Sequence, residues 1–172
     1  MSKTAINYEA GHEYVDLGLS VRWATCNLGA ESPTEYGYRF ACGKNKTPGY
    51  DRANTRWHGR WRIPSEEEFR ELIDNCSFEW EEHEEIRGIS FTSVKPGFEC
   101  NSIFLRASGL FEIEDEGPYE YGLYWSSSIN MGDTFPLFLP LILMFEKGLT
   151  GKGEATIVSH CHNHWASVRP VF

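Results

Sequence analysis

Apolar residues alternate with polar or small residues near the start of the chain. The alternation runs over residues 14–24, and Gly29 and Pro33 follow it. A period of two is typical of a half-buried strand, and Gly and Pro interrupt regular structure. The pattern therefore predicts a first strand near residues 14–25 and a loop after it.

A helix start stands out in the middle of the chain. Ser65 can accept a hydrogen bond from the N3 amide while Glu68 reaches back to the N-cap, which is the pattern of a capping box. The acidic residues 66–68 suit the positive end of a helix dipole, and an apolar stripe follows them. We predict a helix from residue 65 to about residue 75. Residues 43–60 have no apolar period, so we expect an exposed loop there.

The rest of the chain predicts short strands and no second long helix. Strand patterns cover residues 89–94, 102–106 and 122–127, with Gly, Pro and acidic loops between them. The acidic run at 79–85 is typical of a solvated face, and we assign it no chemistry.

Composition and charge narrow the function. With 172 residues, 41% of them hydrophobic and 15% aromatic, residues 1–172 can form a single domain with its own core. A net charge of −9 disfavours nucleic acid as a partner. The longest apolar run, 135–145, contains two prolines and is shorter than the roughly 20 residues of a membrane helix, so we expect no membrane insertion.

The N-terminal residues and the cysteines bear on the compartment of the protein and on its disulfide chemistry. The first nine residues contain no apolar signal region, which fits a cytoplasmic, trimmed or lysis-released protein, and we favour the surface of a cell or a phage virion. The five cysteines are odd in number and form no CxxC pair. We therefore expect no disulfide framework or zinc ribbon, and mostly buried thiols.

Several sequence blocks follow one another from residue 14 to residue 171. They are YVDLGLSVRWATCNLGA (14–30), YG (36–37) with FA (40–41), WRIPS (61–65), NSIFL (101–105), YWSSS (124–128) and SVRPV (167–171). These blocks resemble the FISUMP (major paralogous) domain of Bacteroidetes-type proteins. The resemblance implies an α+β, C-type-lectin-like fold with a small twisted antiparallel sheet, one or two helices and long loops. Formylglycine-generating enzymes and the variable proteins of diversity-generating retroelements share that fold.

The chain departs from the family pattern at several places. Cys42 replaces the usual aromatic residue, and residues 106–109 replace Pro-Ala-Ala-Gly. The larger departure lies between YWSSS and SVRPV, where the family usually has polar strands rich in Asn and Tyr. This chain has an apolar segment at 135–143 and a histidine-rich segment at 159–164.

In retroelement-diversified proteins of this fold, the variable residues lie in this C-terminal stretch. Adenine mutagenesis of Asn-type codons cannot produce Glu, Gln, Lys, Met or Trp, and residues 134–143 and 155–164 contain none of these. The fixed scaffold positions would then be Met131, Met144, Glu146, Lys147, Lys152, Glu154 and Trp165. A diversified binding site and an ordinary divergent family member both stay open.

The apolar segment has two interpretations, as buried core or as an exposed contact patch. Pro136 and Pro140 each lack a backbone donor and fit poorly in a central strand, so we expect a loop or an edge. An exposed patch of this kind would mark a protein-binding surface.

Three histidines raise the alternative of a metal site. His160, His162 and His164 would face one side of an extended segment, but the outer two would stand about 13 Å apart. We therefore favour imidazoles on a recognition surface and expect no metal and no other cofactor. Calcium is not expected, because the Glu-Pro-Asn, Gln-Pro-Asp and Trp-Asn-Asp elements of calcium-dependent lectins are missing.

These patterns favour a non-enzymatic ligand-binding domain of receptor or adhesin type. Its partner would be a protein or a cell-surface ligand of unknown identity. The expected contact residues are Ile129, Asn130, Asp133, Phe135, Leu137, Phe138, Leu139, Leu141, Ser159, His160, His162, Asn163 and His164. The alternatives are a surface or pilus-type structural component and a metal-dependent enzyme built on the histidines.

Overall fold

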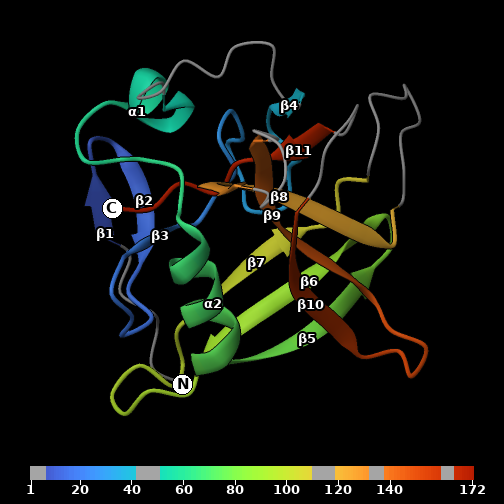
Figure 1. Cartoon of the computed structure of the whole chain (residues 1–172). Helices are drawn as coiled ribbons and strands as arrows, with labels where there is room; N and C mark the ends of the chain where they lie inside the picture. Colours follow the sequence, from blue (N-terminus) through green and yellow to red (C-terminus); the bar gives the residue numbers. More distant parts are fainter. Residues whose placement is uncertain (1–6, 42–50, 110–118, 132–137, 160–164) are drawn as a thin grey trace.

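The computed structural model describes residues 7–41, 51–109, 119–131, 138–159 and 165–172 (Figure 1). Within these ranges it contains two helices, α1 (Arg52–Trp57) and α2 (Glu66–Asn75). The strands are β1 (Asn7–Glu9), β2 (His12–Val15), β3 (Trp23–Ala24), β4 (Arg39–Ala41), β5 (Cys76–His83), β6 (Ile86–Ser93), β7 (Ser102–Arg106), β8 (Tyr121–Met131), β9 (Phe138–Lys147), β10 (Gly153–Ser159) and β11 (Trp165–Ser167). Neither of the described helices is long and apolar enough to cross a membrane.

The strands form three small sheets. Their orders are β1-β2-β3, β5-β6-β7 and β10-β9-β8-β11-β4. Every pairing between these strands is antiparallel except that of β11 with β8. The fold is therefore α+β, rich in antiparallel strands and poor in helix. The strands predicted at 102–106 and 122–127 are confirmed as parts of β7 and β8, and the one predicted at 89–94 is confirmed as part of β6 up to Ser93.

Two hydrophobic cores lie on opposite faces of the five-stranded sheet. Leu143 and Tyr124 belong to one core, while their chain neighbours Ile142 and Trp125 belong to the other. Successive side chains of a strand point to opposite faces, so each core covers one face. The first core also holds α2 and the β5-β6-β7 sheet, and the second holds α1.

The sequence prediction of α2 is confirmed, including its start. The Ser65 hydroxyl accepts from the Glu68 N–H at 3.3 Å, and the Glu68 carboxylate accepts from the Ser65 N–H at 2.8 Å. Phe69 and Leu72 are fully buried in the first core. Each such burial contributes about 1.5–3 kcal/mol, which holds the helix on the sheet.

The single strand predicted near residues 14–25 is wrong. β2 ends at Val15, and β3 begins only at Trp23. Between them the Asp16 carboxylate accepts from the Gly18 N–H at 2.9 Å, and Gly18 has a φ of 71°, a left-handed conformation that interrupts extended backbone. The alternation still marks burial, because every second residue from Val15 to Val21 is buried.

Two further elements depart from the sequence prediction. Part of the loop expected at 43–60 is α1, whose N-cap Asp51 accepts from the Asn54 N–H at 2.9 Å. Residues 42–50 lie outside the described ranges. The acidic run is mostly strand β5, whose glutamates are exposed while Phe78 and Trp80 are half-buried. The cysteines also differ from expectation: Cys76 is buried, but Cys26 is half-buried and Cys100 is exposed. Cys42 and Cys161 are outside the described residues.

The loop or edge expected over the apolar segment is wrong for residues 138–145. They belong to β9, which pairs with β8 on one side and with β10 on the other. Among the described residues, the pairing of β9 with β10 reaches Leu141, and Pro140 pairs with Ile129 of β8 next to a bulge. A bulge is a place where a strand tolerates proline. The remainder of that segment, 135–137, lies outside the described residues.

Candidate functional site

The structure describes the side chains of four of the predicted contact residues. Ile129, Asn130 and Ser159 are exposed, and Leu141 is buried. Phe138 and Leu139 belong to β9, but their side chains lie outside the described part of the structure. The other predicted residues, also outside it, are Asp133, Phe135, Leu137, His160, His162, Asn163 and His164.

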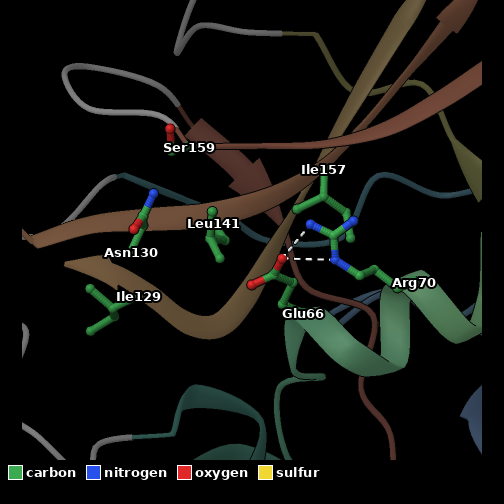
Figure 2. A pocket seen from close by; sticks show the side chains of 7 residues that line it. All are labelled: Glu66, Arg70, Ile129, Asn130, Leu141, Ile157 and Ser159. Carbon is green, nitrogen blue, oxygen red and sulfur yellow. Dashed lines mark hydrogen bonds and ion pairs between the residues drawn. The ribbon is translucent and has the colours of Figure 1, made fainter. Parts of the chain in front are cut away.

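All four described residues line one pocket of about 370 Å³ (Figure 2). Ile129 and Asn130 come from the end of β8, Leu141 from β9 and Ser159 from the end of β10. Three further residues complete the lining: Ile157, from the segment 155–164 that the sequence singled out, and Glu66 and Arg70, which it did not connect with a contact surface. The pocket therefore joins the C-terminal strands to the first turns of α2.

The pocket lies where α2 stops covering the sheet. Leu143 is packed in the core that holds α2, and Leu141 is the next residue of β9 on the same face. Ser159 pairs directly with Leu141, and Ile157 pairs with Leu143. Beyond the N-terminus of α2, this face of the sheet becomes the floor of the pocket.

A bulge in β8 shapes the side of the pocket next to the helix. Trp125 pairs with Ile142 and Ile129 pairs with Pro140, so residues 126–128 stand opposite the single residue between those partners. The bulged residues hold the helix start. The Ser127 N–H donates to the Pro64 carbonyl at 2.8 Å, and the Ser128 hydroxyl accepts from the Glu66 N–H at 2.9 Å. The bulge thus fixes the distance between α2 and the end of β8.

An ion pair forms the charged wall of the pocket. The Nε of Arg70 donates to Oε1 of Glu66 at 2.8 Å, across one helical turn. The Glu66 side chain is 24% exposed and the Arg70 side chain 60% exposed, so both can contact a ligand. Figure 2 shows one Glu66 oxygen facing Arg70 and the other directed toward the side of the pocket that Leu141 and Ile129 line.

A second ion pair stabilises the same helix start. Burial opposes ionisation of Glu68, but hydrogen bonds from Arg62 and from the Ser65 N–H outweigh it and lower the pKa of Glu68. The Arg62 guanidinium donates to this carboxylate at 2.8 Å. The capping box is therefore charged at neutral pH, which suits the positive end of the helix dipole.

The lining combines polar and charged groups with apolar side chains. It offers a carboxylate, a guanidinium, an amide and a hydroxyl around three branched aliphatic side chains. Such a set can supply both hydrogen bonds and apolar contact. Leu141 corrects the expectation of an outward contact residue, because it is only 8% exposed and forms part of the floor. Within the described ranges, no group of three His, Cys, Asp or Glu side chains is placed to hold a metal ion.

Glu66 and Arg70 carry no sequence signal that ties them to the C-terminal strands, whereas Ile157 lies within β10 itself. Glu66 was noted only as a residue that suits the helix dipole. Its place beside Ser128 depends on a contact between residues 62 positions apart, and periodicity within one segment does not report such a contact.

The sequence was also compared with protein-family models, curated proteins and solved structures, and none of them matches it.

Proposed function

We propose that the chain is a non-enzymatic ligand-binding domain of receptor or adhesin type, which uses the pocket between α2 and the ends of β8 and β10. One observation carries this proposal. Four residues chosen from the sequence as contact residues, from three separate strands, line the same open pocket. Leu141 and Ser159, which line that pocket, belong to the two segments that depart from the FISUMP pattern.

The blocks that resemble the FISUMP family support an arrangement in which a buried, rigid frame carries the exposed binding residues. Trp23, Tyr124 and Arg169 come from three of these blocks, and all are fully buried. The Arg169 guanidinium donates to the Asn27 amide oxygen at 3.0 Å, and the Asn27 amide donates to the Tyr124 hydroxyl at 3.1 Å. We also propose that this frame is C-type-lectin-like. The ligand would bind at its C-terminal strands without calcium.

The strand pairing adds an argument for diversification by a retroelement. Residues 141–143 and 157–159 belong to the two segments that lack Glu, Gln, Lys, Met and Trp, and they pair with each other in β9 and β10. Ile142 and Leu143 are fully buried, so the displayed positions of this ladder are on the β10 side. A near-copy of the 3′ end of the gene beside a reverse transcriptase, differing mainly at adenines, would support diversification. A locus without such a copy would exclude diversification and favour an ordinary divergent member of the family that the chain resembles.

A binding screen with matched variants tests the pocket. Ile129 is 45% exposed on the pocket rim, and Val94 is 56% exposed on the loop after β6. Arrays of extracellular proteins and of cell-surface glycans would be probed with wild type, Ile129→Arg and Val94→Arg. We expect Ile129→Arg to lose ligands that wild type and Val94→Arg both bind. Equal binding by all three proteins would exclude the pocket as the binding site.

A further inference from the structure

We propose that the pocket binds a primary ammonium group on an aliphatic chain, as at the end of a lysine side chain of a partner protein. This inference rests on the proposed function, because it names the ligand chemistry of the same pocket. It follows from three properties of the described lining: where the apolar groups lie, where the hydrogen-bond acceptors lie, and how the Arg70 guanidinium is paired with a carboxylate.

The apolar part of the lining is smaller than the polar part, but it can contact an alkyl stem. Ile129, Leu141 and Ile157 contribute branched aliphatic groups from three different strands. Side chains of the lysine type bury their methylene chains along such surfaces and keep the charged end at polar groups.

The polar part offers acceptors for an ammonium group. One Glu66 oxygen accepts from Arg70, and the other is directed toward the pocket (Figure 2). Asn130 and Ser159 each add a side-chain oxygen to the lining. An ammonium group has three donors and no acceptor, so the Glu66 carboxylate can accept one donor as its charged partner, and the amide oxygen and the hydroxyl are further acceptors along the lining.

The charges favour a cation over an anion. Arg70 is the cation of the lining, and both its Nε and one terminal nitrogen already donate to Glu66. The guanidinium keeps further N–H donors, but an anionic ligand bound there would lie beside the Glu66 carboxylate and face the acidic residues 66–68 of the first helical turn. The net charge of −9 also attracts cations to the surface.

Titration of the isotope-labelled full chain by NMR tests the ammonium directly. The probes are the N-acetyl, N-methylamide derivatives of lysine, ε-acetyl-lysine and norleucine, which share the stem but differ in the terminal group. We expect the lysine probe to shift the amide signals of Leu141, Ile157 and Ser159. The other two probes should bind at least about tenfold more weakly. Butylamine distinguishes a free alkylamine from a peptide-borne lysine by whether it binds more tightly than the lysine probe.

Two variants should change the affinity for the lysine probe in opposite directions. Glu66→Gln should weaken the lysine probe about tenfold, and Arg70→Gln should strengthen it, because the first removes the negative partner and the second removes a repelling cation. Glu66→Gln keeps the backbone N–H that binds Ser128, so the helix start is retained. Glu154→Gln changes an exposed carboxylate of β10 outside the pocket lining and should leave binding unchanged.

Three results would overturn the ammonium assignment. Equal binding of the three probes would show that the charge is not recognised. Binding of a carboxylate-ended probe that Arg70→Gln weakens would replace a cation by an anion and leave the proposed function standing. If no probe shifts the pocket signals, the ligand chemistry is wrong, and the array comparison of Ile129→Arg with Val94→Arg decides separately whether the pocket binds anything.

Discussion

The backbone N–H of Glu66 donates to the hydroxyl of Ser128 at 2.9 Å. Glu66 is the first residue of α2, and Ser128 belongs to the bulge of β8. The bond therefore satisfies one of the unpaired donors at a helix start with a side chain from the sheet. It also sets the position of the ion pair in Glu66 and Arg70 relative to the exposed end of β8.

Ser128→Ala tests this connection. Removing the hydroxyl leaves the Glu66 N–H without its partner, so we expect the free energy of unfolding to fall by about 1 kcal/mol. Urea unfolding followed by circular dichroism gives the change. Ser102→Ala in β7 is the control, because Ser102 is exposed, and its change should stay within about 0.5 kcal/mol. Equal stability of Ser128→Ala and wild type would show that the hydroxyl does not hold the helix start.

Local chemistry explains which elements the sequence predicted well. The start of α2 depends on Ser65 and Glu68, three residues apart, and both halves of the capping box are formed. The strands β6, β7 and β8 likewise carry their patterns within a few residues. The sequence does not predict α1, because its six residues, Arg52–Trp57, contain too few turns to show an apolar period.

Long-range contacts explain what the sequence did not predict. Pro140 argues against a central strand, yet it lies in β9 beside the β8 bulge, where a strand tolerates proline. Sequence alone does not show the bulge. The C-terminal half of the pocket was predicted in part, through Ile129, Asn130 and Ser159, because its composition departs from the rest. The helix half, Glu66 and Arg70, was not, since only the tertiary fold brings it there.

The Glu68 carboxylate predicts a pH dependence of stability. Hydrogen bonds from Arg62 and Ser65 lower the pKa of Glu68 in the folded protein below its ordinary value of 4.5. Its contribution to stability is therefore fully present above pH 4.5 and is lost as the pH falls through the folded pKa. Glu68→Gln should be less stable than wild type at pH 7, and this difference should shrink in acid.

Urea unfolding of both proteins at neutral pH, near pH 4.5 and well below it measures that difference. Glu79→Gln is the control, because Glu79 is exposed on β5, and its difference from wild type should not shrink in the same way. A difference for Glu68→Gln that stays constant with pH would mean that the charge of the carboxylate does not stabilise the fold.

Trp61 is predicted to be a main stabilising residue of the second core. It is fully buried, its ring centroid lies 5.2 Å from that of Trp57, and its indole N–H donates to the Glu9 carbonyl at 2.9 Å. Trp61→Ala should cost about 3–5 kcal/mol of unfolding free energy. Trp61→Phe keeps most of the packing and loses the hydrogen bond, so it should cost less. Thermal and urea unfolding rank the three proteins, and an equal cost of both changes would contradict the packing argument.

Arg169 is predicted to be irreplaceable by lysine. Its fully buried guanidinium donates to the Asn27 amide oxygen and to the carbonyls of Ala24, Thr25 and Phe104 at 2.8–3.1 Å. Burial lowers the pKa of this guanidinium, and the four acceptors offset the loss of water around it. A lysine ammonium has three donors in a compact group and cannot reach all four oxygens.

Arg169→Lys should therefore cost about 3 kcal/mol or more, because it leaves buried carbonyls unpaired around a displaced charge. Arg22→Lys is the matched control. Arg22 forms an exposed ion pair with Asp16 at 2.9 Å, and its change should cost about 1 kcal/mol or less. If Arg169→Lys does not fold, Asn27→Ala measures the same network through a smaller loss. Wild-type stability of Arg169→Lys would show that the network at the C-terminus does not depend on the planar guanidinium.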